Sequence, residues 1–296
     1  MVLEMFKMFT VRKRKNSNDY LPSNPKAVYI EDMEQAGYEN MDPYQKDKPQ
    51  PNLCYFSGLI LLVQGLGLTA VILVAVWMGH FQGGFAWQED PDKEFNYHPV
   101  FMVIGMIFLY ADAILAYRVF RNINKLYIKL VHGAIHLGAL IFASVALKAV
   151  FDSHNLKVKD GKPAPIPNLY SLHSWIGIIT VVMFGLQWVC GFIAFFFPKL
   201  GFAGRALYMP HHVFWGLAVF GLACAAALTG ITEKAFILMF AAGFKYSMLP
   251  SEGVVINCLG LSIIMLAVVV FYVVTRPEYK RPKGPEEEER IQLSSN

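Results

Sequence analysis

Six long apolar segments constrain this chain to a fold that crosses a lipid bilayer several times. The segments cover residues 54–78, 98–117, 131–150, 172–197, 211–231 and 254–275. Each has about the 20 residues that an α-helix needs to cross the hydrocarbon core, where a helix satisfies its own backbone hydrogen bonds. The composition agrees, because 55% of the residues are hydrophobic and only 16% are charged. We therefore expect an all-α integral membrane protein with six transmembrane helices.

The residues outside these segments suggest how the chain is organised. We expect residues 1–52 to form a disordered cytosolic tail, residues 53–276 the six-helix membrane domain, and residues 277–296 a cytosolic C-terminal tail. A further apolar run, residues 235–244, is too short to cross a bilayer. We expect it to lie at the membrane interface or to pack in the loop between the last two spans.

Basic residues predict the orientation of the chain. The connection 118–130 contains four lysines and arginines without an acid, and the connection 198–210 contains two. Because cytoplasmic loops carry an excess of such residues, both termini are predicted to be cytosolic. The connection 148–171, with four lysines and two aspartates, is an exception on the opposite side. This topology explains the net charge of +4, which gives no reason to expect binding to nucleic acid.

Four histidines stand near the start of successive apolar segments. They are His98, His132, His173 and His212. In a chain that weaves through the bilayer, the first and third lie on one side and the second and fourth on the other. Ionisable groups in spans are costly and tend to be functional, and neutral imidazole is a good ligand for haem iron. The set therefore predicts two stacked bis-histidine metal centres and an electron path across the membrane.

Other interpretations of these histidines remain open at this point. A single histidine at a helix end is often an ordinary interfacial residue, so the prediction depends on the set. His136 lies one helical turn beyond His132 on the same face, and it competes for the ligand role. The chain has no Cys-x-x-Cys-His motif, so any haem would be held without thioether links. Its four cysteines fall in or beside apolar segments, which argues against a disulfide framework.

Several local motifs make the chain similar to a known family. They are Phe95-Asn96-Tyr97-His98-Pro99, Lys129-Leu130-Val131-His132, Ser171-Leu172-His173-Ser174-Trp175, Met209-Pro210-His211-His212 and Pro250-Ser251-Glu252-Gly253. Over about residues 55–283 the chain resembles the cytochrome b561 family of transmembrane ascorbate-dependent oxidoreductases.

The resemblance implies two non-covalent b-type haems held by a core of four helices. It pairs His98 with His173 at the non-cytosolic haem, and it pairs His132 with His212 at the cytosolic haem. It favours His132 over His136, because the family ligand follows a lysine in a Lys-x-x-His pattern.

The resemblance also implies a substrate site on each face. Ascorbate is an anion at neutral pH, and the family's cytosolic ascorbate site matches Lys125, Lys129 and Arg205, although the positive-inside rule alone would also place cations there. On the opposite face the resemblance points to His154, Asn155 and Tyr170, which are otherwise expected to be solvated loop residues. There the catalytic residues would be His154 as a proton donor and Tyr170 as a hydrogen-bonding group.

The leading hypothesis is electron transfer from cytosolic ascorbate to a monodehydroascorbate radical in a lumenal or extracellular space. A ferric-chelate reductase that serves iron uptake is the alternative within the same chemistry. A histidine-dependent transporter or proton channel is the alternative from another class, although it would favour broken helices and an ionisable group in the middle of the membrane. The resemblance allows a homodimer, and it is compatible with a secretory-vesicle, endo-lysosomal or plasma membrane.

Overall fold

The computed structural model describes residues 53–241 and 245–282. Two units are distinguished along the chain, Met1–Ser57 and Gly58–Asn296. In the first unit the described residues are 53–57, where helix α4 begins. The second unit contains the rest of α4, the other helices of the described residues and every residue of the candidate sites. The predicted N-terminal tail, residues 1–52, lies outside the described residues, as do residues 283–296 of the predicted C-terminal tail 277–296.

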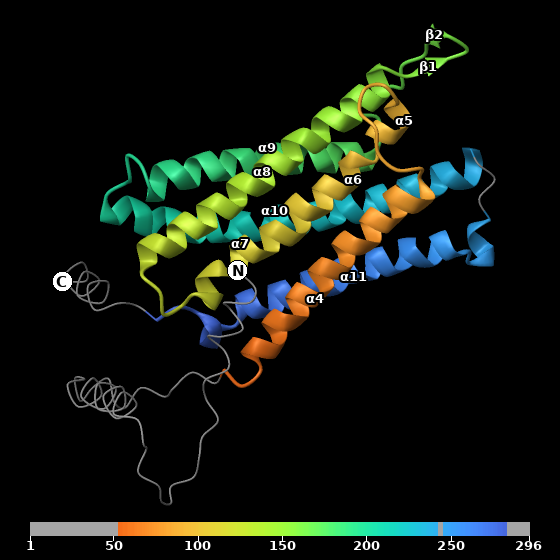
Figure 1. The fold of residues 1–296 in the computed structure, drawn as a ribbon. Helices are drawn as coiled ribbons and strands as arrows, with labels where there is room; N and C mark the ends of the chain where they lie inside the picture. The colour runs from red at the N-terminus through yellow and green to blue at the C-terminus, as the bar shows by residue number, and fades with distance from the viewer. Residues whose placement is uncertain (1–52, 242–244, 283–296) are drawn as a thin grey trace, which may run out of the picture. The chain divides into compact units, whose positions relative to one another are not determined.

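Among the described residues, six helical spans are long and apolar enough to cross a membrane, which confirms the predicted all-α fold with six transmembrane helices. The first consists of α4 (Phe56–Val76) and a π-helical turn η1 (Trp77–Phe81), and the second of α5 (Pro91–Glu94), α6 (Tyr97–Met102), a π-helical segment η2 (Val103–Leu109) and α7 (Tyr110–Val119). The others are α8 (Lys125–Asn155), α9 (Leu172–Phe195), α10 (Phe202–Ala241) and α11 (Ser251–Thr275). Figure 1 shows consecutive spans running in opposite directions.

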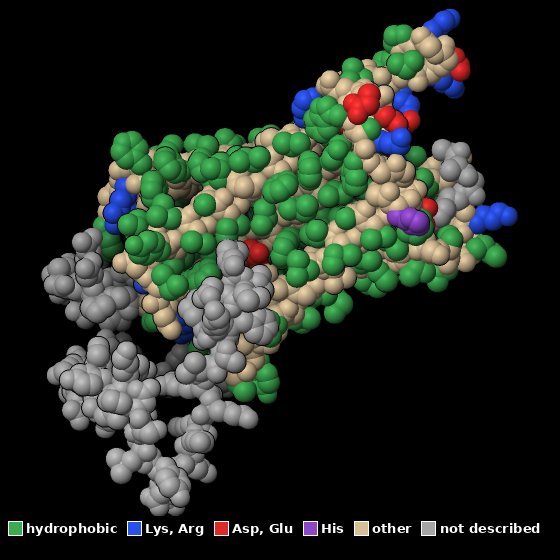
Figure 2. All heavy atoms as spheres, in the orientation of Figure 1, with side chains coloured by type: hydrophobic (Ala, Val, Ile, Leu, Met, Phe, Trp, Pro, Cys, Tyr) green, Lys and Arg blue, Asp and Glu red, His purple; other side chains and the backbone are tan. Residues whose placement is uncertain are grey.

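Short elements connect the spans. A two-stranded antiparallel hairpin, β1 (Val158–Lys159) and β2 (Lys162–Pro163), follows α8. A 3-10 turn η3 (Tyr246–Met248) precedes α11, and another, η4 (Pro277–Tyr279), follows it. In the view of Figure 2, hydrophobic side chains cover the flanks of the helices, whereas charged side chains gather over α5 and the hairpin. This distribution is typical of a protein whose helix flanks face lipid.

Several helices are longer than the apolar segments that predicted them. Helix α8 begins at Lys125, where the Asn124 side chain caps it by accepting a hydrogen bond from the Leu126 N–H at 2.9 Å. Helix α10 continues to Ala241. Of the two alternatives for the run 235–244, packing in the loop between the last two spans was therefore wrong for residues 235–241, which continue α10, because an apolar run that extends an existing helix needs no new nucleus.

The second span packs together with α8, α9 and α10, the helices that carry the four histidines. Helix α9 packs along α10, and α8 packs against α6, η2 and α7. A Cβ atom added at Gly105 would lie 2.9 Å from both the Ala139 carbonyl oxygen and the Phe142 Cβ, so this glycine allows η2 and α8 to approach closely. Helix α4 is attached through Gln64, whose amide donates to the Asp112 carboxylate at 2.6 Å.

Candidate functional site

Two histidines face each other at the end of the bundle that carries the hairpin. The imidazole centroids of His98 on α6 and His173 on α9 are 6.1 Å apart, with an interplanar angle of 83°. Each Nδ1 lies beside a backbone carbonyl, 3.2 Å from Ala146 O and 2.8 Å from Ala226 O, respectively. If Nδ1–H donates to these oxygens, Nε2 is left unprotonated on each ring and can bind a metal.

A second pair has almost the same spacing at the other end. His132 on α8 and His212 on α10 have centroids 6.2 Å apart, with an interplanar angle of 67°. The Nδ1 atom of His132 lies 2.8 Å from Ala113 O. His212 differs, because its Nδ1 lies 3.1 Å from the Gln187 side-chain nitrogen, which donates to the His212 carbonyl at 2.7 Å. The histidines that were paired from the sequence therefore lie together, His98 with His173 at one end of the bundle and His132 with His212 at the other.

Both spacings fit a single metal ion between two imidazoles. A metal–imidazole nitrogen bond is about 2.0 Å long and the ring centroid lies about 1.2 Å behind that nitrogen, so two opposed ligands have centroids about 6.4 Å apart. Among the described residues, no cluster of three or more His, Cys, Asp or Glu side chains could hold a bare metal ion. Two ligands on opposite sides suit a macrocycle that supplies the remaining metal ligands itself, so the donor set fits haem.

His136 lies in an aromatic cluster in the interior rather than opposite a second histidine of such a pair. Its ring is buried, 4.8 Å from the Tyr110 centroid and 5.4 Å from that of Phe184. It also lies 4.5 Å from the His132 ring. The geometry therefore favours His132 over His136 as the partner of His212.

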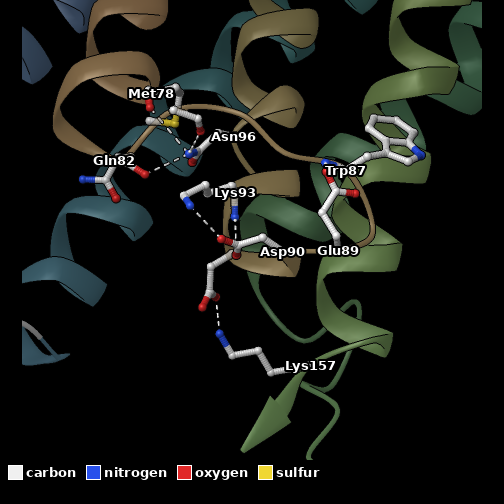
Figure 3. Close-up of polar contacts among 10 residues, drawn as sticks. Met78, Gln82, Trp87, Glu89, Asp90, Lys93, Asn96 and Lys157 are labelled. Atoms are coloured by element: carbon white, nitrogen blue, oxygen red, sulfur yellow. Dashed lines mark hydrogen bonds and ion pairs between the residues drawn. The ribbon is translucent and has the colours of Figure 1, made fainter.

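A polar network, shown in Figure 3, holds the loop that precedes His98. The Asn96 side chain donates to the carbonyl oxygens of Gln82 at 3.0 Å and Gly84 at 2.7 Å. Gly84 has a φ of 86°, a conformation that glycine adopts without strain. Farther along the loop, hydrogen bonding from Lys93 lowers the pKa of Asp90, and Lys157 forms an ion pair with Asp92. The network fixes the loop two residues before His98.

A cavity of about 210 Å³ lies beside the His98–His173 pair. Its lining is largely apolar, with Met102, Met106 and Val181 among the residues, and it becomes polar toward the hairpin end. An apolar wall beside paired imidazoles suits a buried prosthetic group.

Two of the three residues predicted for a site on this face line the cavity. His154 and Tyr170 contribute to its wall, and the Tyr170 side chain is well exposed. Asn155 is not part of the lining. It accepts a hydrogen bond at 2.9 Å from Asn168, whose Oδ1 lies 2.9 Å from His154 Nδ1. Asn155 therefore supports the cavity through Asn168.

Sequence reasoning missed several polar residues of this wall, among them Asn168, Ser171, Glu233 and Lys234. The last two stand where α10 runs beyond the apolar segment 211–231. Charged residues at a span end are expected in any membrane protein, and only the fold shows that these two reach the cavity.

Basic side chains gather at the opposite end. Lys125 and Lys129 on α8 lie within electrostatic reach of each other and of Arg205 on α10. Lys199 and Arg281 extend this basic cluster. Lys129 donates to the Phe195 carbonyl at 3.3 Å, and the Phe195 ring lies 5.2 Å from the His212 imidazole. The three predicted cations therefore lie together, and Phe195 lies between Lys129 and the His212 ring of the second histidine pair.

Arg118 has a different environment from these cations. It is buried, and it donates to the carbonyl oxygens of Val274 and Arg276 at the end of α11. Cationic groups stabilise the carbonyl end of a helix. Arg118 therefore anchors α11.

Comparison with known proteins gives consistent matches. The family model for eukaryotic cytochrome b561 matches residues 97–238. The transmembrane ascorbate-dependent reductase of Homo sapiens is 44% identical over 225 residues, covering 76% of this chain and 85% of the relative. A Caenorhabditis elegans protein named as a homologue of that reductase is 43% identical over 248 residues, with 81% and 91% covered. A plasma membrane ascorbate-dependent reductase of Xenopus tropicalis is 41% identical over 236 residues, with 78% and 80% covered.

Proposed function

Because the chain belongs to the cytochrome b561 family, we propose that it carries electrons across a membrane from cytosolic ascorbate to an acceptor on the opposite face. Relatives along most of its length are named ascorbate-dependent reductases, and the chain is an oxidoreductase of this kind. The observation that carries the two-centre proposal is the nearly equal spacing of the histidine pairs, 6.1 and 6.2 Å between centroids.

The proposed reaction moves one electron through the protein in each cycle. On the cytosolic face an ascorbate monoanion loses one electron and one proton and becomes the monodehydroascorbate radical anion. On the other face a monodehydroascorbate radical anion gains one electron and one proton and becomes ascorbate. A ferric chelate would take one electron without a proton, so it is the alternative acceptor.

Two non-covalent b-type haems are proposed, one for each histidine pair. When bound, haem supplies an iron centre that can accept and release a single electron. His98 and His173 would hold one haem, and His132 and His212 would hold the other. The backbone carbonyls beside Nδ1 orient three of these four rings, and the apolar wall of the cavity excludes water.

The basic cluster is proposed to be the cytosolic ascorbate site. Lys125, Lys129 and Arg205 concentrate an anionic donor next to the His132–His212 pair, because clustered charge of one sign attracts the opposite charge. The same orientation places both termini in the cytosol and His154 and Tyr170 on the acceptor side. There His154 can pass the proton that the radical needs, and Tyr170 can hydrogen-bond its ring.

The chain is a multi-pass membrane protein, and its compartment is proposed from its relatives. One relative is named a plasma membrane reductase, so a plasma membrane location is proposed beside a secretory-vesicle or endo-lysosomal one. The chain is also proposed to form a homodimer.

Replacement of single histidines tests the proposal. Purified full-length wild type is expected to contain two haems and to show a reduced b-type spectrum after addition of ascorbate. His98→Ala and His173→Ala should each lose one haem, His132→Ala and His212→Ala should lose the other, and His136→Ala should keep both. Pigment extraction and reduced-minus-oxidised spectra measure this.

Two outcomes would contradict the proposal. A wild-type protein without any b-type spectrum would favour the transporter alternative. A His136→Ala protein that lacks a haem, together with a His132→Ala protein that keeps two, would show that His136 rather than His132 is the haem ligand.

A further inference from the structure

One cation on the wall of the cavity is not part of the predicted sites. Lys234 lies on α10 one helical turn after Gly230, the residue against which the His173 ring packs. Residues four apart share a helix face. The Lys234 Nζ atom lies 4.6 Å from the centroid of the Phe95 ring, and that ring is 6.1 Å from the His98 imidazole. The ammonium group therefore stands one aromatic ring away from His98.

The neighbouring acid, Glu233, has other partners that balance its charge. Its Oε2 atom accepts a hydrogen bond from the Ser171 hydroxyl at 2.9 Å. Ser171 is the N-cap of α9 and forms a capping box with Ser174. A helix N-terminus stabilises a nearby negative charge. Glu233 is thereby compensated without Lys234.

The remaining acids within electrostatic reach of Lys234 are also engaged elsewhere. They are Asp92, which pairs with Lys157, and Glu252, which accepts hydrogen bonds from Trp77 and Gln82. The ion pairs found among the described residues do not include Lys234. Within that part of the chain, Lys234 is a cation on the cavity wall without a carboxylate partner in contact.

We propose that Lys234 binds an anionic oxygen of the electron acceptor and makes this cavity selective for anionic acceptors. This inference rests on the proposed function, in which an electron leaves the protein beside the His98–His173 pair. A monodehydroascorbate radical and a ferric hydroxy-acid chelate both carry negative charge and share this chemistry. Asn168 and His154, on the same wall, supply hydrogen bonds to hydroxyl groups of either acceptor.

The test compares acceptors of opposite charge. The full-length, haem-loaded protein is reconstituted in vesicles that enclose ascorbate, and an impermeant acceptor is added outside. Ferricyanide and ferric citrate serve as anionic acceptors, and hexaammineruthenium(III) serves as the cationic one. The variants are Lys234→Gln and the matched control Lys162→Gln, which removes an exposed lysine from β2 on the same side.

Lys234→Gln should lower the rates with both anionic acceptors by about three- to tenfold, because one fixed charge near the acceptor is removed. The rate with the cationic acceptor should stay constant or rise, and the haem spectrum should not change. Lys162→Gln should leave the ratio of anionic to cationic rates at the wild-type value.

Other results overturn the inference. An unchanged rate ratio in Lys234→Gln, including an equal loss with every acceptor, would exclude charge selection by this residue. The same ratio change in Lys162→Gln would assign the effect to the general field of this face. If the wild type passed no electron from enclosed ascorbate to any acceptor, the proposed function would fail instead.

Discussion

Gly230 on α10 and Gly191 on α9 each lie against a histidine ring of the other helix, and they differ in how much space an added side chain would have. A Cβ atom at Gly230 would lie 2.6 Å from the His173 ring, and one at Gly191 would lie 3.0 Å from the His212 ring. The first distance requires the imidazole to move, whereas the second requires an adjustment of a few tenths of an ångström. The two histidine pairs should therefore respond differently to the same substitution.

We expect Gly230→Ala to displace His173 and to weaken or abolish haem binding at the His98–His173 pair. Overpacking of this kind costs about 1–3 kcal/mol. Gly191→Ala should have a smaller effect, at the His132–His212 pair. The control is Gly221→Ala, also on α10, where the added Cβ would be at an ordinary contact distance of 3.5 Å. Haem content and the electron paramagnetic resonance spectra of the oxidised proteins measure the outcome. Equal haem loss in the Gly191 and Gly230 variants would refute this order.

At this scale the sequence shows which residue types are present but not what they contact. The four histidines could be paired in advance because consecutive spans must reverse direction, and that alone puts alternate histidines at one end. The contact between Gly230 and His173 depends on how two helices rotate against each other. The same dependence concealed Lys234, which looks in the sequence like an ordinary charge at the end of a span.

At the level of the elements, Glu252 joins the start of α11 to the end of the first span. One of its carboxylate oxygens accepts hydrogen bonds from the Trp77 indole at 2.8 Å and from the Gln82 amide at 2.6 Å. Trp77 is almost fully buried, so water cannot easily replace the acceptor. Glu252 belongs to the Pro250–Gly253 motif, and these contacts give that motif a structural role.

We expect Glu252→Ala to destabilise the protein by about 1–3 kcal/mol, because the buried indole N–H would lose its acceptor. Glu252→Gln keeps an acceptor oxygen and should cost less. The midpoint of thermal unfolding of detergent-purified full-length protein, followed by tryptophan fluorescence, compares the two variants. Equal losses in both would mean that the negative charge, rather than the hydrogen bond, is what matters there.

The six helices could be predicted from the sequence because a long apolar segment in a membrane has few alternatives to a helix. Their bounds could not, since polar residues such as Lys125 and Asn155 can continue a helix beyond the hydrocarbon at little cost. The π-helical segments η1 and η2 were also missed. They have no signature in single residues, and η2 places Gly105 against α8 only after the spans have packed.

The two ends of the molecule differ in their electrostatics. Five basic residues form the cluster beside the His132–His212 pair: Lys125, Lys129, Lys199, Arg205 and Arg281. Beside the other pair, Lys234 shares the cavity wall with Glu233 and has Asp92 and Glu252 within electrostatic reach. An anion approaching the first end meets a strong field, whereas one approaching the second meets Lys234 and other lysines, such as Lys157, whose charges are nearly balanced by neighbouring carboxylates.

This asymmetry predicts that salt slows electron entry more than electron exit. The screening length falls from about 30 Å at 0.01 M salt to about 8 Å at 0.15 M, so the summed field of several partly exposed charges of one sign weakens most. Over this range the rate of haem reduction by ascorbate should fall several-fold, whereas the rate of reoxidation by ferric citrate should fall less. Rapid mixing of the purified protein with each reagent separates the two steps.

A variant connects this prediction to particular residues. Lys129→Gln should lower the entry rate at low salt and reduce its salt dependence, because part of the attracting field is removed. It should leave the exit rate and the haem spectrum unchanged. Arg118→Gln is the control, since that buried arginine anchors the carbonyl end of α11 and is not part of the cluster. If both steps had the same salt dependence in the wild type, the basic cluster would only set the orientation of the chain in the membrane, and ascorbate would have to dock elsewhere on the His132–His212 end.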